Sequence, residues 1–352
     1  MMVPSASDLD GGRFWAEAQV TLDGRGVTLP VSGGSLVWQA DQWPATRISG
    51  LVLPRLAEDD TDVLSDGLVG SDGHRLRITC HAENGGRAWQ WELGEYLLTK
   101  VSQTQASVTA EAVDLSELTI KHEGRVPRAV HASARPVEII AQMLAEDNVT
   151  FTFEQGIPLP RVRAGYAIGT DRGEALHELA DMWGVYLHPH PSGGLAAYQL
   201  PSEPVSDPEI RFSDMPGPTG QAPIIGSELT LERSQIYNHI IVPVRDSDKV
   251  AEATQNAGRY AVQRFGYQSL RVDSGAVGHF AEAQGLAKIK LRQSLLRTVT
   301  RPVEAMPDWR VRPYSGVEVE TLDDGKQWGR ITGFDLPLVH NKSAVYDVGM
   351  EL

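Results

Sequence analysis

The residues nearest to a chemical motif are His177, Glu178 and Asp181, on a predicted helix. They follow the start of the helical zinc motif HExxH, but an aspartate stands where the second histidine belongs. Glu174 lies three residues before His177 and would share its helix face. The second histidine makes the motif specific for zinc, so its absence favours a solvated helix face over a metalloprotease site.

Two histidines, His188 and His190, flank Pro189 and could in principle chelate a metal. It is followed by Pro191 and by a Ser-Gly-Gly run at 192–194. Proline and glycine at this density are typical of a turn, so a turn is the favoured interpretation.

The chain has one cysteine, Cys80, which excludes an intramolecular disulfide and a cysteine-based zinc site. Leu76, Ile78 and Cys80 alternate with polar residues, so the sulfur is predicted to be a thiol in a strand. A single thiol fits a protein made in a reducing cytoplasm.

The sequence contains no G-x-S-x-G elbow, Walker A loop or GxGxxG turn. Acidic residues are numerous, but their spacing nominates no pair as general acid and base. One region carries a basic cluster: Arg125, Arg128, Arg135, Arg161 and Arg163. We interpret the cluster as a salt-bridged surface, with an interface to an acidic neighbour as the alternative. We therefore assign no catalytic, cofactor-binding or metal-binding residue, and we expect no cofactor and no enzyme activity.

The charge balance excludes two broad classes of surface. Lys and Arg number 32 against 46 Asp and Glu, which gives a formal net charge of -14. A general nucleic-acid surface needs clustered positive charge, and so does docking on an anionic membrane face. No apolar run is long enough for a transmembrane helix, and the first residues do not have the pattern of a secretory signal. The 352 residues suffice for two to three domains.

These residues are placed by a β-rich pattern interrupted by helices. Residues 13–115 read as strands with turns every 8 to 12 residues, including the hairpin Asn84-Gly85-Gly86, which predicts a barrel or sandwich. Helical periodicity predicts helices over 136–145, 171–183 and 281–297. The proline-rich stretch 201–226 reads as a connector, and strands return at 226–250 and 301–352. The pattern is compatible with two divergent copies of one β module, and it predicts a β-rich α+β fold.

The order of these features resembles the tail-hub and baseplate-hub proteins of tailed bacteriophages and contractile injection systems. The resemblance is carried by an ordered series of segments rather than by a short motif: Arg47–Pro54, Leu93–Leu98, Ser107–Leu118, the helix Pro136–Ala145, Gly165–Ile168, the helix Glu174–Trp183 with the following Gly184–Leu187, Gly193–Leu195 and Trp328–Phe334.

The resemblance implies two tail-tube-like β-barrels with intervening α/β segments. The first barrel would occupy residues 1–115, and an α/β domain with its Pro/Gly-rich connector would occupy 116–225. The second barrel would be split into 226–250 plus 301–352 by a helical insertion at 251–300 that packs with the α/β domain. The two barrels are expected to superpose on each other.

The resemblance also implies a function and a set of partners. Three chains would present six barrels and so adapt a hexameric tail tube to a trimeric spike or fibre. Partners would be further copies of the chain, a distal tail or tail-tube protein, a tape measure protein, a spike or central fibre protein, and phage DNA in transit. The chain would be a minor tail protein of the virion, assembled in the host cytoplasm, with no membrane insertion of its own.

Two alternatives come from other functional classes. One is a virion-associated polysaccharide or peptidoglycan hydrolase with an acidic pair, and the other is a carbohydrate-binding tail-tip module. The chain lacks the long C-terminal extension of many siphovirus hubs, so receptor binding or wall cleavage by this chain is not expected. We also expect acidic side chains to outnumber basic ones on any channel wall, because a basic wall would retain DNA.

Overall fold

The structure is a computed structural model, and it describes most of the chain. The described residues are 12–22, 25–54, 69–104, 107–124, 126–131, 134–214, 222–227, 230–231, 236–245, 247–339 and 342–351. Strands dominate over helices, which confirms the predicted β-rich α+β class. Arg125 of the predicted basic cluster lies outside the described residues.

The elements of the first half follow the chain in this order: β1 (Arg13–Leu22), β2 (Arg25–Pro30), β3 (Gly33–Gln39), β4 (Thr46–Pro54), β5 (Arg75–Asn84), β6 (Arg87–Gln103), β7 (Ser107–Asp114), α2 (Ser116–Lys121), β8 (Arg128–Ala129), α3 (Pro136–Glu146), β9 (Phe151–Phe153), β10 (Ala167–Ile168) and α4 (Arg172–Trp183).

The second half continues with these elements: β11 (Val185–Pro189), β12 (Leu195–Gln199), β13 (Ile210–Ser213), β14 (Ala222–Ser227), β15 (Thr230–Leu231), β16 (His239–Pro243), β17 (Val250–Thr254), α5 (Val262–Phe265), β18 (Ser269–Arg271), α6 (Phe280–Thr298), β19 (Val299–Ala305), β20 (Gly316–Thr321), β21 (Gly325–Pro337) and β22 (Ala344–Met350).

The first β unit contains seven strands in the order β3-β4-β7-β6-β5-β1-β2. Its strands bury every second side chain, so Leu76, Ile78 and Cys80 of β5 point into the core. The predicted hairpin between β5 and β6 is confirmed, with Gly85 and Gly86 both at positive φ, which a two-residue turn favours. The sheet is curved, so the chain just after β2 lies beside β4. There the Ser32 amide donates to the Val52 carbonyl at 2.9 Å.

The second β unit is a closed barrel of six strands. β14, β13, β20, β21, β22 and β19 pair in a ring, and β19 pairs with β14 to complete it. Its interior is filled by apolar side chains that include Phe212, Val319 and Tyr346, none of them exposed. Closure pairs each of the six strands with two others of the ring, and it leaves the end of β21 beyond β20 as an edge for a further strand.

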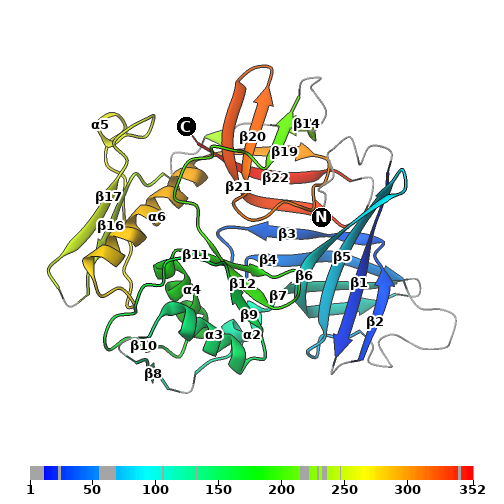
Figure 1. Cartoon of the computed structure of the whole chain (residues 1–352), viewed down its shortest axis with the longest axis horizontal. Coiled ribbons are helices and arrows are strands. Elements are labelled where there is room, and N and C mark those ends of the chain that lie inside the picture. The colour runs from blue at the N-terminus through cyan, green and yellow to red at the C-terminus, as the bar shows by residue number, and fades with distance from the viewer. Residues whose placement is uncertain are drawn as a thin grey trace.

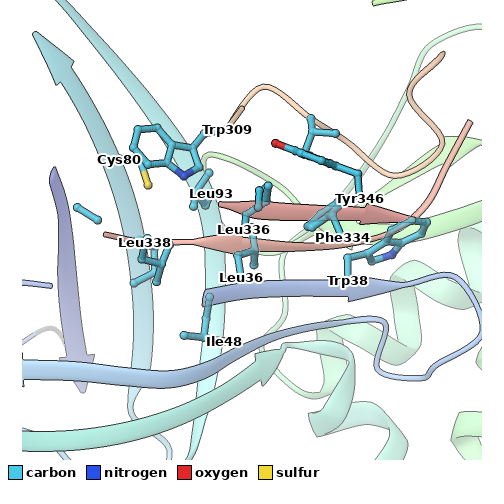
Figure 2. Packing of buried hydrophobic residues seen from close by; sticks show 14 of the residues in the cluster. Leu36, Trp38, Ile48, Cys80, Leu93, Trp309, Phe334, Leu336, Leu338 and Tyr346 are labelled. Carbon is cyan, nitrogen blue, oxygen red and sulfur yellow. The ribbon is translucent and has the colours of Figure 1, made fainter. Parts of the chain in front are cut away.

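One strand pair joins the two units into a single fourteen-stranded sheet. β3 pairs antiparallel with β21, from Gly333 opposite Gln39 to Pro337 opposite Ser35. We call this pairing the seam. Figure 1 shows β3 of the first unit lying beneath β21 of the second. Figure 2 shows Trp38 and Phe334 from the two sides of the seam beside each other, and their rings are 5.6 Å apart.

Helices and two small sheets form a separate layer with its own core. α2, α3 and α4 pack near the sheet β9-β12-β11, while α6 covers the sheet β17-β16-β18. Leu176 and Leu179 of α4 belong to one buried cluster together with Ile240 of β16 and Leu286 of α6. Figure 1 shows this layer beside the two β units. Among the described residues, no helix has the length and apolar character needed to cross a bilayer.

The helix predictions are confirmed, while two boundaries of the second barrel are wrong. Residues 210–213, predicted as connector, form β13 of the closed barrel, because Phe212 is fully buried there and pairs in parallel with β14 and β20. Residues 239–243, predicted as barrel, form β16 of a separate sheet instead. Ile240 and Val242 bury their side chains against the helical layer, which leaves β16 no place in the barrel ring. The mutual superposition of the barrels stays a prediction.

Replacing Trp38 by alanine tests the seam. Trp38 is buried, lies directly opposite Phe334 and contacts the ring of Tyr314 at 5.4 Å. Truncation removes apolar burial and leaves a cavity, so the free energy of unfolding should fall by about 3–5 kcal/mol in urea titrations. Trp328→Ala, at a half-exposed position of β21, should cost no more than about 1 kcal/mol. Equal losses in the two variants would contradict a structural role for the seam.

Candidate functional site

The side chains of the HExxH-like motif, His177, Glu178 and Asp181, do not point toward one common metal position. The His177 ring stacks on Trp43 at 5.5 Å, and its Nε2 lies 3.2 Å from Asp181, which also pairs with Lys290 at 2.7 Å. Burial alone would raise the pKa of Asp181, but the hydrogen bond from His177 and the charge of Lys290 lower it overall. Among the described residues, no group of three His, Cys, Asp or Glu side chains could hold a metal.

Glu178 lies apart from Trp43 and Asp181, the neighbours of His177. It connects the α4 helix to the loop before α6. Its carboxylate accepts hydrogen bonds from the Tyr166 hydroxyl at 3.1 Å, the Ser274 hydroxyl at 2.9 Å and the Ala276 amide at 3.0 Å. A polar hollow of about 790 Å³ lies at this place. Since protein donors occupy its central carboxylate and its wall mixes both signs of charge, the hollow favours no particular ligand.

The two predicted turn histidines have separate neighbours. His190 Nδ1 lies 2.7 Å from the Ser192 hydroxyl, within the tight turn that joins β11 and β12. His188 Nδ1 lies 3.2 Å from the Thr46 hydroxyl of β4, so it ties the hairpin to the first β unit. Burial and the nearby charge of Arg312 lower the pKa of His188 to about 3. The histidines hold the turn in place and do not share a ligand position.

Cys80 is the predicted strand thiol. It is fully buried. Figure 2 labels its side chain in the apolar cluster that also contains Trp309. Burial raises the pKa of the thiol far above its ordinary value, which keeps the sulfur protonated and unreactive.

The predicted arginine cluster is salt-bridged at Arg128. Arg128 donates to Glu146 at 2.6 Å, and the buried Arg172 donates to the same carboxylate at 2.6 Å. Burial would raise the pKa of Glu146, but the hydrogen bonds from both arginines lower it overall. Sequence analysis missed Arg172, because a helix-start arginine carries no sign of burial. Arg163 donates instead to the Gly275 carbonyl at 3.1 Å.

A groove lies where the first β unit, the hairpin β11–β12 and the second barrel meet. It consists of two adjoining hollows of about 380 and 430 Å³ that share Tyr198, Arg310 and Arg312. We call it the junction groove. The alternation of Trp309, Arg310, Val311 and Arg312 is the one local sign that arginines project from this loop. No local motif links positions as distant as Tyr198 and Arg312.

The architecture, two β units joined edge to edge with a helical layer beside them, is shared with solved structures of phage tail proteins. No protein-family model matches the chain, and no curated protein matches it in sequence. The tail protein from Neisseria meningitidis MC58 matches 96% of both chains at 10% identity, with a TM-score of 0.63.

Two further structures share the fold. The 43 kDa tail protein of prophage MuSo2 from Shewanella oneidensis is 12% identical and matches 94% of this chain and 97% of that chain, with a TM-score of 0.57. The E. coli c3393 protein, a component of the type VI secretion system, is 11% identical over 95% of this chain and 77% of that chain, with a TM-score of 0.51. The predicted resemblance to phage hub proteins is thus confirmed as a likeness of fold.

Replacing His188 by glutamine should change how stability depends on pH. The folded-state pKa of about 3 lies below the ordinary 6.5, so neutral His188 stabilises the fold above pH 6.5. That contribution is lost as the pH falls from 6.5 toward 3, because only the unfolded chain takes up the proton. Below pH 6.5 the wild type should lose about 1.4 kcal/mol more per pH unit than the variant in urea titrations. His190→Gln is the control, and identical slopes for wild type and His188→Gln would contradict the assignment.

Proposed function

We propose that the chain is the structural hub of a phage tail tip or baseplate. Three copies would place six β units around one axis. They would adapt a hexameric tail tube to a trimeric spike or central fibre and surround part of the DNA exit channel. The shared fold with phage tail proteins supports a structural role in the tail.

The observation that carries this proposal is the seam. A ring of six units built from three chains requires that the two units of each chain keep a fixed spacing and tilt. The ladder between β3 and β21 fixes both, because five residue pairs and a buried aromatic contact hold the units edge to edge. A flexible linker between the units would not define such a ring.

The second barrel carries exposed apolar side chains that suit a contact between copies. Ile225 lies at a bulge of β14 and is 63% exposed, and Leu322 in the turn after β20 is 73% exposed. Val345 of β22 pairs with Glu304 on the same outer surface as Ile225 and is also exposed. Exposed apolar side chains of this size are typical of protein interfaces when they gather on one surface.

Further partners follow from the hub role. They are a distal tail or tail-tube protein on one side, a spike or central fibre protein on the other, the tape measure protein, and DNA in transit. The chain would reside in the virion after assembly in the host cytoplasm. A trimer would carry three times the formal charge of -14, and we place enough of that charge on the channel wall to keep DNA from binding there.

The hydrolase alternative is less well supported by the carboxylates. The pKa of Asp114 is raised by burial, but its oxygens accept from Ser116 and Thr46 inside the fold. The pKa of Asp347 is raised by burial and by the charge of Asp41, and neither residue lines any of the three hollows described above. We therefore propose that the chain is not an enzyme.

Light scattering coupled to size-exclusion chromatography tests the trimer. We expect a mass three times the 38.4 kDa of one chain, and negative-stain class averages with threefold symmetry. A ring with six copies, or a monomer at every concentration, would contradict the proposal.

The double variant Ile225→Asp/Leu322→Asp tests the contact surface. Two new charges on an apolar contact must be desolvated on assembly, so the trimer should dissociate at least tenfold more readily, by about 1.4 kcal/mol or more. The control is Tyr267→Asp, which places a charge at a 64% exposed aromatic outside the barrel. Equal dissociation in both variants would show that the surface is elsewhere.

The absence of hydrolase activity is tested by zymography. The purified chain should leave a peptidoglycan gel uncleared while lysozyme on the same gel clears it. Clearing that disappears in Asp347→Asn would establish the hydrolase alternative and overturn the non-enzymatic assignment.

A further inference from the structure

The junction groove has the dimensions of a small-molecule site. Each of its two hollows, about 380 and 430 Å³, falls within the usual range for such sites. Its walls come from β6, from β11 and β12, and from the loop at residues 309–315 before β20. Together with Leu36 of β3 and with Phe334 and Leu336 of β21, these separately anchored parts of the chain form it, so its shape is set by the packing of the fold.

Aromatic side chains supply much of the groove's apolar surface. Tyr186 and Tyr198 stack with ring centroids 5.5 Å apart and an interplanar angle of 23°. Trp91 lines the neighbouring hollow beside Trp309, 5.7 Å away. Partly exposed, rigid aromatic rings bind apolar ligand faces at a small entropic cost.

Polar groups with unused hydrogen-bonding capacity stand beside these rings. Among the described residues, the Arg312 guanidinium and the Glu154 carboxylate have no hydrogen-bond or ion-pair partner, and neither does the Tyr198 hydroxyl. The two neighbouring arginines do have partners. Arg310 pairs with Asp308, and Arg330 donates to backbone carbonyls. The groove therefore offers donors and acceptors together, with opposite charges that balance.

The loop that carries Arg312 is held in a strained conformation. Tyr314 has φ of 60°, in the left-handed region that a tyrosine rarely adopts. Its amide donates to the Ile331 carbonyl at 3.0 Å, and its own carbonyl accepts from Arg330 at 3.1 Å. Strained backbone that the surrounding structure maintains is typical of binding sites, and here it positions the loop along the groove.

Two features of the lining argue against other ligand classes. Pro189, Pro191, Pro201 and Pro313 lie along the groove, and proline has no N–H to pair with an added peptide strand. A phosphate or nucleic acid would require an excess of positive charge, but Glu154, Glu92 and Glu209 oppose the three arginines. A neutral ligand rich in hydroxyl groups satisfies both conditions.

We propose that the junction groove is a saccharide-binding site that takes a short neutral oligosaccharide. The C–H face of a sugar ring packs on Tyr198 and Trp91, while its hydroxyls accept from Arg312 and donate to Glu154. This inference does not rest on the hub function, since it requires only the groove of one chain. No bond is made or broken in the site.

Intrinsic fluorescence measures the binding, because tryptophans line the groove. Chitotetraose, maltotetraose and mannotetraose are titrated separately into the full-length protein. At least one should give a saturable change at concentrations up to about 10 mM, which covers the weak affinities of single saccharide sites.

Three variants locate the site. Arg312→Ala removes an exposed, unpaired cation and should weaken binding about tenfold, whereas Tyr198→Phe keeps the stacked ring and should weaken it about threefold. Arg259→Ala, at an exposed arginine in the loop before α5, should bind like the wild type. Thermal unfolding confirms that each variant is folded.

Three outcomes would overturn the proposal. The first is no saturable change with any of the three sugars. The second is unchanged binding by Arg312→Ala, which would place the sugar elsewhere on the chain. The third is a density map of the assembled tail in which a polypeptide segment is seated on Tyr198, which would make the groove a protein contact.

Discussion

The pairing of β3 with β21 is the constraint on which the rest of the structure depends. It makes one sheet of two β units, and the side chains beneath it, Trp38 and Phe334, belong to a core that both units share. Neither unit can shift along the other without moving this core, because a register shift by one residue would turn buried side chains outward. The geometry of a larger assembly can therefore be encoded in a single chain.

A chain of hydrogen bonds ties the helical layer to this sheet. The Thr46 amide donates to Asp114 at 3.0 Å, the Ser116 amide at the start of α2 donates to the same carboxylate at 3.0 Å, and the Thr46 hydroxyl lies 3.2 Å from His188. β4, α2 and β11 thus meet through the side chains of Asp114, Thr46 and His188 and the backbone amides of Thr46 and Ser116. Buried polar networks of this kind specify one arrangement, since any other would leave a polar group unsatisfied. The network also fixes one wall of the junction groove relative to the first β unit.

The helices and hairpins could be predicted from local sequence signals. Strands whose partners lie far away in the sequence could not be predicted in this way. Asp171 and Gly184 mark the ends of α4, because the Glu174 amide binds Asp171 at 2.8 Å and Gly184 takes the left-handed φ of 77°. Phe212 escaped notice because its strand is four residues long, lies among prolines, and acquires its partners from β14 and β20.

The same distinction applies to the groove. Tyr198 and Arg312 are adjacent in space but lie more than a hundred residues apart in sequence, so no spacing could connect them. The histidine motif on α4, by contrast, could be interpreted from the sequence alone, because the aspartate at position 181, where the second histidine belongs, is visible there. Sequence patterns identify the helices and strands, whereas the sites formed between them depend on tertiary packing.

The closed barrel has a consequence for how the chain is made. β13 emerges from the ribosome long before β20 and β22, which flank and close its ring, and the whole sheet β17-β16-β18 with α6 is synthesised in between. At ordinary translation rates the early strands wait on the order of ten seconds for their partners. During that interval the apolar face of Phe212 and the bare edges of β13 and β14 are open to wrong pairing. The barrel can therefore close only after its last strand, β22, has been synthesised.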